Sequence, residues 1–321
     1  MMHSSRLELN GGHYDILESP PSPVEFSQIC HISRPVLIKG YKIPNLQRWS
    51  NKYLADTMGD RLLSVAVTPN GYADAVTLSS DGKRYFVEPY YEKMTMRSLL
   101  SKLAPSTSNV EDVCYLQSQN GNLFPGSYFT SGDMESDCEL INLRDDVPAE
   151  IPWCSEALGR SPDAVNLWIG NNRSVTSIHS DPYENIYHVA RGCKTFLLVP
   201  PTEGWCLKER MFPHATYQRA TENSPLLLKP SPSTTPAVRW SSIQHPERPG
   251  SLSEMTHPLI IDVNAGETLY LPAGWWHHVR QTGLSIALNW WYDIEPRGSA
   301  WVWLRLLRGV AIVAADEEVE E

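Results

Sequence analysis

Alternating apolar and polar residues dominate the chain from Asp163 onward, in short runs that turn signals separate. Such runs predict antiparallel strands that bury one face. We expect single strands at 165–169 and 175–180, followed by three hairpins with tight turns that pair 185–190 with 193–199, 259–263 with 268–271, and 277–280 with 285–291. Short strands at regular spacing are typical of an antiparallel barrel or jelly roll, so we predict a barrel in this half of the chain.

Helical and extended segments are mixed in the first half of the chain. The apolar periodicity predicts helices at 24–30, 47–58 and 96–103, and strands at 34–40, 62–67 and 113–117. Near the other end, 299–315 is predicted to form an amphipathic helix whose apolar residues include Trp301, Leu304, Leu307 and Ile312. This helix either packs on its own barrel or forms a dimer interface. We favour a homodimer, because the helix is terminal and carries two tryptophans.

These segments together indicate a mainly β fold with flanking helices, which we divide into four parts. The parts are a flexible N-terminal lead (1–23), an N-terminal α/β portion (24–135), a barrel core (136–297), and a C-terminal helix with an acidic tail (298–321). Within the core, 220–256 is rich in Ser, Pro and Thr. That composition predicts a long surface insertion rather than a domain boundary.

Charge and cysteine usage narrow the class of protein. The 321 residues carry a formal net charge of −10, whereas non-specific nucleic-acid binding needs a concentrated positive field, so we expect no direct DNA binding. The six cysteines follow no CxxC or disulfide-framework spacing, which favours reduced cysteines in a cytoplasmic or nuclear protein. No apolar run approaches the roughly 18 residues that can span a membrane, so we expect no membrane association.

Two histidines and one aspartate carry the clearest candidate chemistry. His179 and Asp181 are two residues apart on a predicted strand, so their side chains point to the same face. A third ligand must come from another strand, and the pair His277-His278 offers it, with the register deciding which ring points inward. Two histidines and one carboxylate form the facial triad that holds Fe(II) and leaves positions open for cosubstrate and oxygen.

Lys194 is the second unusual residue of the predicted barrel. Pairing across a two-residue turn places it on the same face as Asn185 and Tyr187, and no acidic side chain of these two strands shares that face. If the face is interior, the buried ammonium needs an anionic partner, which a bound carboxylate ligand would supply. The alternative is a lysine at the barrel rim whose ammonium reaches solvent.

Several of these motifs resemble a known family. The group His179-Ser-Asp181 with Lys194, and the run Leu269-Tyr-Leu-Pro-Ala-Gly-Trp-Trp-His277-His-Val, resemble the JmjC branch of the Fe(II)/2-oxoglutarate oxygenases. The resemblance covers nearly the whole chain and implies a double-stranded β-helix core of the cupin or jelly-roll type. Segments 64–76, 153–159 and 183–187 resemble in particular one subfamily of lysyl hydroxylases, whose members have also been described as peptidases.

The resemblance implies roles for individual residues. His179, Asp181 and His277 match the ligands of Fe(II). Lys194 matches the residue that pairs with the distal carboxylate of the cosubstrate 2-oxoglutarate, with O2 as the second cosubstrate. The hydroxyl donors to the same carboxylate match Thr176 and Tyr115, and the other polar residues near the cosubstrate and metal match Asn185, Tyr187 and Asn289. Strict alternation would put Thr176 and His179 on opposite faces, so a bulge near Ser177 is required.

For the substrate, the resemblance implies hydroxylation of a lysyl side chain at C-3 in a developmentally regulated GTP-binding protein. Asp74 and Glu184 are candidates for the negative charge that would attract such a side chain, with a solvated or turn position as the plainer reading of each. Histone-tail demethylation and histone-tail endopeptidase activity are alternatives. A further alternative is a non-catalytic, metal-bound cupin that binds a protein partner; a buried Lys194 facing the metal argues against it.

Overall fold

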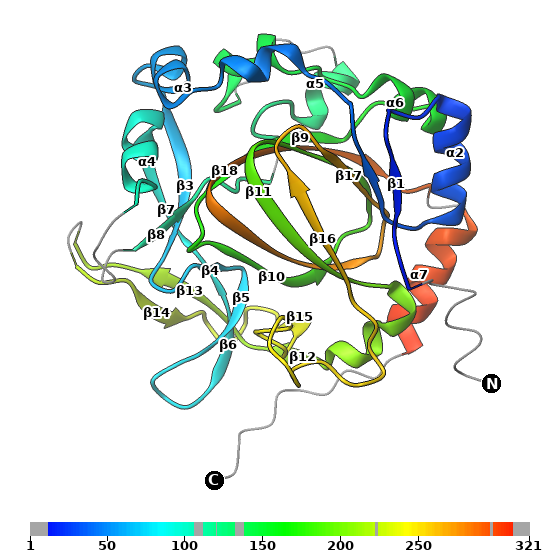
Figure 1. The fold of residues 1–321 in the computed structure, drawn as a ribbon. Coiled ribbons are helices and arrows are strands. Elements are labelled where there is room, and N and C mark those ends of the chain that lie inside the picture. The colour runs from blue at the N-terminus through cyan, green and yellow to red at the C-terminus, as the bar shows by residue number, and fades with distance from the viewer. Residues whose placement is uncertain are drawn as a thin grey trace.

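The computed structural model describes residues 12–105, 112–119, 121–131, 138–221, 224–295 and 298–310 (Figure 1). Residues 1–11 of the predicted N-terminal lead and the whole acidic tail lie outside the described residues, and the four-part division of the chain stays a prediction. Within the described ranges, no helix is long and apolar enough to cross a membrane. All six cysteines are free.

The described part of the barrel consists of two four-stranded antiparallel sheets, which share two long strands. One sheet has the order β9 (Ala164–Gly170), the second half of β18 (Trp276–Asp293), the first half of β11 (Tyr183–Val199) and β17 (Thr268–Leu271). The other has the order β10 (Val175–Ser180), the first half of β18, the second half of β11 and β16 (Leu259–Asn264). This is the double-stranded β-helix that we predicted.

The three predicted hairpins are wrong in their connections. β11 and β18 are each one continuous strand that bends from one sheet into the other, and β16 and β17 lie end to end along the same edge of β11. The residues taken for a turn, Arg191 and Gly192, are instead part of a double register shift between Val189 and Cys193. Gly192 has φ +80°, and a bulge glycine in this conformation resembles a turn glycine in sequence.

Replacing Gly192 with alanine should destabilise the protein. A Cβ there would meet the Leu284 carbonyl oxygen at 2.7 Å, in addition to the strain of a positive φ. We expect the free energy of unfolding to fall by about 1–3 kcal/mol, as measured by urea denaturation. Gly82→Ala is the matched control, because Gly82 has the same φ of +80° and no atom within 4 Å of the added Cβ. Equal losses in both variants would show that the close approach at the bend is unimportant.

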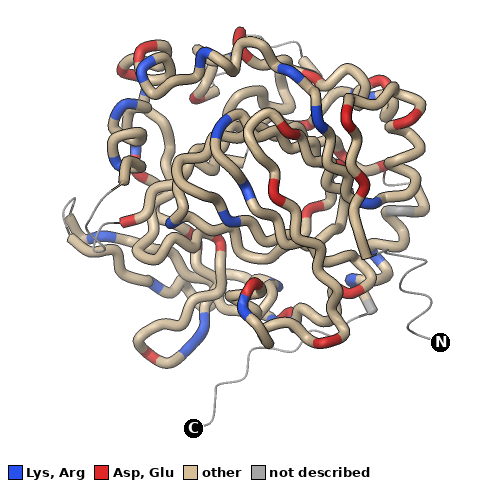
Figure 2. Tube along the Cα trace, viewed as in Figure 1, with Lys and Arg blue, Asp and Glu red and all other residues tan. Residues whose placement is uncertain are grey.

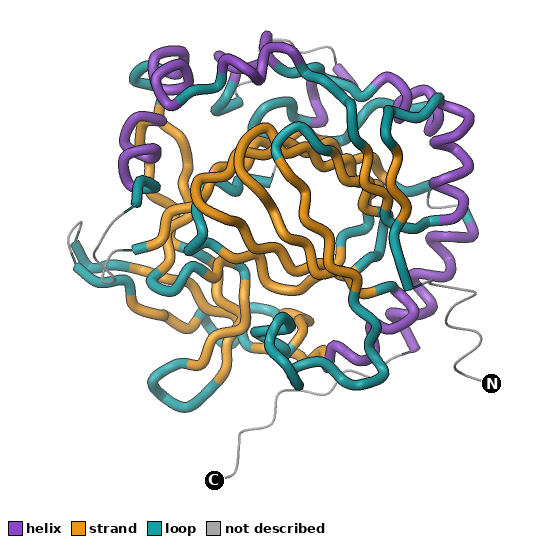
Figure 3. The backbone as a smooth tube through the Cα atoms, in the orientation of Figure 1, coloured by secondary structure: helices purple, strands orange, loops and turns teal. Residues whose placement is uncertain are grey.

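Helices and smaller sheets surround the barrel (Figure 3). The helices predicted at 24–30, 47–58 and 96–103 are confirmed as α2 (Pro23–Ile32), α3 (Asn51–Met58) and α4 (Met96–Lys102), although α3 begins later than predicted. Ser22 and Glu25 form a capping box at the start of α2. The described part of the helix predicted at 299–315 is confirmed as α7 (Ser299–Val310). The remaining helical segments are η1 (Pro44–Arg48), α5 (Gly126–Ser131), η2 (Ile141–Asp146), α6 (Pro152–Leu158) and η3 (Pro201–Leu207). The remaining strands of the N-terminal portion are β1 (Asp15–Leu17), β2 (Val36–Ile38), β3 (Leu62–Thr68), β4 (Tyr72–Ala73), β5 (Ala75–Leu78), β6 (Arg84–Glu88), β7 (Tyr90–Thr95) and β8 (Val113–Tyr115).

The segment predicted as a surface insertion carries two strands. β14 (Leu227–Pro230) pairs with β13 (His214–Gln218), which in turn pairs with β6. β15 (Val238–Ser241) pairs with β12 (Glu209–Phe212) and brings Trp240 toward the barrel. Part of this segment therefore contributes to the interior of the molecule.

Helix α7 contacts its own barrel and also leaves apolar side chains exposed. Leu304 lies against Gly274, where an added Cβ would come within 2.2 Å of Leu304 Cδ2. The exposed apolar residues of the helix are Val302, Trp303, Leu306 and Leu307. Both alternatives for this helix stay open, and the homodimer stays a prediction. Acidic and basic residues are interspersed along the described chain in the view of Figure 2.

Candidate metal centre and its cavity

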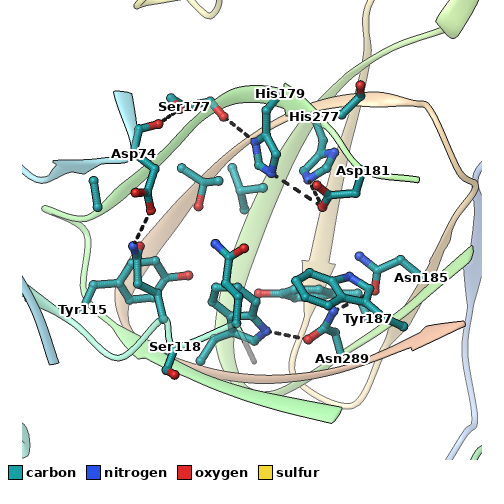
Figure 4. Close-up of a pocket in the computed structure, with 18 of the residues that line it drawn as sticks. Asp74, Tyr115, Ser118, Ser177, His179, Asp181, Asn185, Tyr187, His277 and Asn289 are labelled. Carbon is teal, nitrogen blue, oxygen red and sulfur yellow. Dashed lines mark hydrogen bonds and ion pairs between the residues drawn. The ribbon is translucent and has the colours of Figure 1, made fainter. Parts of the chain in front are cut away.

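Three ligand-type side chains meet at one end of the barrel (Figure 4). His179 near the end of β10 is directly paired with His277 at the start of β18, and Asp181 follows β10. Asp181 Oδ2 lies 3.6 Å from His179 Nε2 and 3.7 Å from His277 Nε2. The three ligand atoms all lie within 4.8 Å of one another, so they can hold one metal ion.

Backbone carbonyls orient both histidine rings. His179 Nδ1 donates to the Ser177 carbonyl at 2.8 Å, and His277 Nδ1 donates to the Trp275 carbonyl at 3.1 Å. Because a carbonyl can only accept, each Nδ1 carries the hydrogen, and the lone pair of a neutral ring is left on Nε2. Burial lowers the pKa of His277 to about 4, which keeps this ring neutral.

Asp181 supplies the negative charge of the group. Burial favours its neutral form, but the charge of His179 and its hydrogen bond outweigh that effect and lower the pKa of Asp181 to about 2. When His179 gives up the proton that it shares with Asp181, the three side chains offer two imidazole nitrogens and one carboxylate oxygen. This set fits the two-histidine, one-carboxylate centre that binds Fe(II).

The bulge predicted near Ser177 is present. The pairing of β10 with β18 shifts register between Thr176 and His179. As a result both side chains line the same cavity despite being three residues apart. Thr176 is also a hydrogen-bond partner of the Tyr115 hydroxyl.

A cavity of about 630 Å³ opens beside the triad. This volume is typical of small-molecule sites and leaves room for a cosubstrate and a substrate side chain. Its wall contains the three triad residues and five of the predicted cosubstrate residues, namely Tyr115, Thr176, Asn185, Tyr187 and Asn289. The structure therefore brings these predicted residues together.

Lys194 is buried within the barrel and does not itself line the cavity. It is 1% exposed, and its Nζ donates to the Tyr115 hydroxyl at 3.2 Å. Burial lowers its pKa from 10.5 to about 7, and within the described residues no carboxylate pairs with it. The alternative of a lysine at the rim is therefore wrong. The ammonium lies directly behind a hydroxyl of the cavity wall and lacks a counter-ion in the part of the chain that the structure describes.

Asn289 is held in a network of side chains at the cavity floor. Its Oδ1 accepts from Trp168 Nε1 at 2.8 Å and from Asn166 Nδ2 at 3.2 Å, and its Nδ2 donates to Asn185 Oδ1 at 3.2 Å. The hydrogen bond from Asn289 thus fixes the orientation of the Asn185 side-chain amide. Tyr187 packs edge-on against Phe196 on the same wall.

Comparison with known proteins identifies the family. The family model described as a cupin-like domain matches residues 21–298. The chain is 38% identical over 308 residues to the lysine-specific demethylase JMJ32 of Arabidopsis thaliana, covering 89% of this chain and 83% of that protein. It is also 38% identical over 288 residues to the human bifunctional peptidase and (3S)-lysyl hydroxylase JMJD7, covering 87% and 84%.

The chain belongs to the cupin-like JmjC family. A third relative, the JmjC domain-containing protein E of Dictyostelium discoideum, is 30% identical over 320 residues and covers 91% of this chain and 87% of that protein. JmjC proteins are oxygenases that use Fe(II) and 2-oxoglutarate. The triad could bind such a metal, and a cavity opens beside it.

Trp240 is a wall residue of this JmjC cavity that sequence reasoning missed. Its ring stacks on His179, with centroids 5.7 Å apart and an interplanar angle of 12°, and its Nε1 donates to Ser177 Oγ at 3.3 Å. No periodic pattern surrounds it in the Ser- and Pro-rich segment, so the sequence carries no signal for its position.

The two acidic candidates for attracting the substrate side chain, Asp74 and Glu184, lie in different parts of the structure, and His278 lies outside the triad. Glu184 is buried away from this cavity, where it accepts hydrogen bonds from the Tyr270 hydroxyl at 2.7 Å and the Ala273 amide at 3.3 Å. Asp74 lines the cavity. His278 is not part of the triad. Its Nε2 lies 3.4 Å from Glu247 Oε2, as expected for a structural group next to His277.

Proposed function

We propose that this protein is an Fe(II)- and 2-oxoglutarate-dependent hydroxylase that acts on lysyl side chains at C-3 of a protein substrate. The observation that carries the proposal is Lys194, a fully buried ammonium without a counter-ion among the described residues. It lies behind the wall of a cavity that also holds a complete triad. A dicarboxylate bridging these two features would satisfy both. The preference for lysine is supported by the human relative, whose name records (3S)-lysyl hydroxylase activity.

The residues of the chain bind, orient and shield the reacting groups. His179, Asp181 and His277 would hold Fe(II), which together with 2-oxoglutarate and O2 supplies the oxidising power needed for an unactivated C–H bond. Lys194 would pair with the far carboxylate of 2-oxoglutarate, while the hydroxyls of Tyr115 and Thr176 donate to it. The remaining role of the cavity is to hold the substrate side chain next to the metal and to exclude water.

We further propose a developmentally regulated GTP-binding protein as the substrate, as the resemblance of the sequence implies. The alternatives raised by the sequence are demethylation or cleavage of histone tails. The plant relative is named a lysine-specific demethylase and the human relative a peptidase as well, which supports these two activities but names no substrate. The expected homodimer, the expected cytoplasmic or nuclear location and the expected lack of DNA binding stay predictions.

Mass spectrometry tests the reaction directly. Lysine-containing peptides and a candidate GTP-binding protein are incubated with the full-length chain, Fe(II), 2-oxoglutarate and O2, and with the His179→Ala variant as control. We expect the gain of one oxygen on lysine, in step with succinate formation, for the wild-type protein alone. Backbone cleavage or loss of methyl groups without that gain would replace the hydroxylase by the peptidase or the demethylase. An absence of succinate with every substrate would favour a binding module.

A further inference from the structure

Asp74 places a second carboxylate on the wall of the cavity, apart from the metal triad. It connects β4 to β5, and β4 runs parallel to β10 as its neighbour. Ser177 Oγ donates to the Asp74 carbonyl at 2.7 Å, and the Ser177 carbonyl accepts from His179 at 2.8 Å. Two hydrogen bonds through one residue therefore link the backbone of Asp74 to a triad ring. In Figure 4, Asp74 lies on the same side as Tyr115 and Ser118, across the cavity from Asp181.

The Asp74 carboxylate has no cationic partner among the described residues. Its one hydrogen-bond donor there is the neutral amide of Gln117, with Nε2 2.9 Å from Oδ2. Burial, followed by the charge of Glu88, raises the pKa of Asp74 to about 6. A partly buried carboxylate without a counter-ion is unfavourable, so a cation brought by a ligand would stabilise it.

The charges of the lining leave Asp74 as the anion that is free to bind a ligand. The described lining contains two carboxylates, Asp74 and Asp181, and no lysine or arginine. In the protein loaded with Fe(II) and 2-oxoglutarate, the two positive charges of the metal and the one of Lys194 would offset Asp181 and the two carboxylates of the cosubstrate. A cavity whose remaining charge is one carboxylate attracts cations over neutral and anionic groups. The aromatic side chains of Phe86, Tyr91 and Trp240 line the cavity too, and such rings accommodate the stem and head of a cationic side chain.

The backbone at Asp74 is held in an uncommon conformation. Its φ is +52°, in the left-handed region that aspartate and asparagine tolerate better than most residues. Strain of this kind persists where the surrounding structure imposes it, and here it turns the chain between two short strands at the cavity wall. Because asparagine tolerates a positive φ as aspartate does, Asp74→Asn removes the negative charge and leaves the backbone conformation unchanged.

We propose that Asp74 binds the ammonium group of the substrate lysine and thereby selects cationic over neutral side chains. The inference rests on the proposed lysyl hydroxylase function and names the residue that determines its specificity. The four-carbon stem of lysine separates the ammonium from the backbone, so the oxidised carbon can lie near the metal while the ammonium reaches the wall. Gln117 holds Asp74 Oδ2, and Oδ1 remains to receive the ammonium.

Binding of two matched peptides tests this assignment. The full-length protein, loaded with Mn(II) and 2-oxoglutarate in the absence of O2, is titrated into fluorescent peptides that carry a central lysine or the uncharged norleucine. We expect wild-type protein to prefer the lysine peptide by about tenfold or more, as for a charge-assisted hydrogen bond. Asp74→Asn should lose this preference, with norleucine affinity, 2-oxoglutarate affinity and the unfolding midpoint unchanged.

Two further variants separate charge from structure. Glu88→Gln is the matched carboxylate control, because the Glu88 side chain is 50% exposed and already lies 3.4 Å from His214, so the lysine preference should persist. Asp74→Gly, which accepts a positive φ without strain, should lose the preference like the asparagine variant. A wild-type preference retained in both Asp74 variants would overturn the inference, as would equal binding of the two peptides by wild-type protein. If the preference depends on Asp74 but lysine gains no oxygen, the proposed reaction fails and the assignment of Asp74 stands.

Discussion

His179→Ala should abolish turnover and weaken metal binding by at least about 100-fold, since altering even the groups that orient a metal ligand costs about 10–100-fold in affinity. The variant loses one of three donor atoms, and the Asp181 carboxylate and His277 Nε2 are left as an incomplete set. Metal affinity is measured by electron paramagnetic resonance with Mn(II), and turnover by succinate release.

The fold should survive this change. The His179 side chain is 17% exposed, and its loss removes one stacking contact with Trp240, so we expect the free energy of unfolding to fall by less than about 2 kcal/mol. His31→Ala, at an exposed position at the end of α2, is the control and should bind metal normally. Full activity or unchanged Mn(II) affinity in the His179 variant would remove this histidine from the metal centre.

The triad could be predicted from sequence because its signal is local. His179 and Asp181 share a face of a strand at a spacing of two residues, and a bulge at Ser177 does not disturb that pair. The interior position of Lys194 was predicted correctly, although from an incorrect connection. After a two-residue turn, and equally after the double register shift, even-numbered residues take the face of the sheet that odd-numbered residues held before it. Either arrangement therefore puts Lys194 on the same interior face as Tyr187.

The path of the chain between the two sheets could not be predicted in the same way. A glycine at positive φ forms a hairpin turn or a bulge equally well, and only the pairing of both halves of β11 with β18 decides between them. For a related reason the sequence named Asp74 as a candidate charge without separating it from Glu184, and it missed Trp240. Asp74 is a left-handed residue between two short strands, and Trp240 lies in a segment without periodicity, so their positions depend on long-range packing.

Lys194→Met should make the ligand-free protein more stable while destroying its affinity for 2-oxoglutarate. The ammonium is 1% exposed and has a hydroxyl as its hydrogen-bond partner. Replacing such a buried charge with an apolar side chain of similar length is often stabilising, by about 1–4 kcal/mol. Lys229→Met, at an exposed position of β14, is the control and should change neither property.

The pH dependence of stability follows from the lowered pKa of Lys194. Between about pH 7 and 10.5 the unfolded chain holds a proton that the folded chain releases, so the contribution of this residue to stability rises with pH in that window. Below pH 7 the lysine is charged in both states, and its unfavourable contribution is complete. The stability advantage of the methionine variant should therefore be largest at pH 6.5 and smaller at pH 9, in urea denaturation at both values.

The affinity for 2-oxoglutarate should depend on the charge of Lys194 in the opposite way to stability, because the charged form favours binding. The dicarboxylate needs the charged ammonium, so above pH 7 the wild-type protein must take up a proton on binding, and its affinity should fall as the pH rises. In Lys194→Met the affinity should be at least about 30-fold lower, as expected when one partner of a buried charge pair is removed, and its pH dependence in this range should disappear. Calorimetric titration of the metal-loaded protein measures both effects. Unchanged affinity would show that the hydroxyls of Tyr115 and Thr176 hold the carboxylate without Lys194, and would leave the buried ammonium without a ligand.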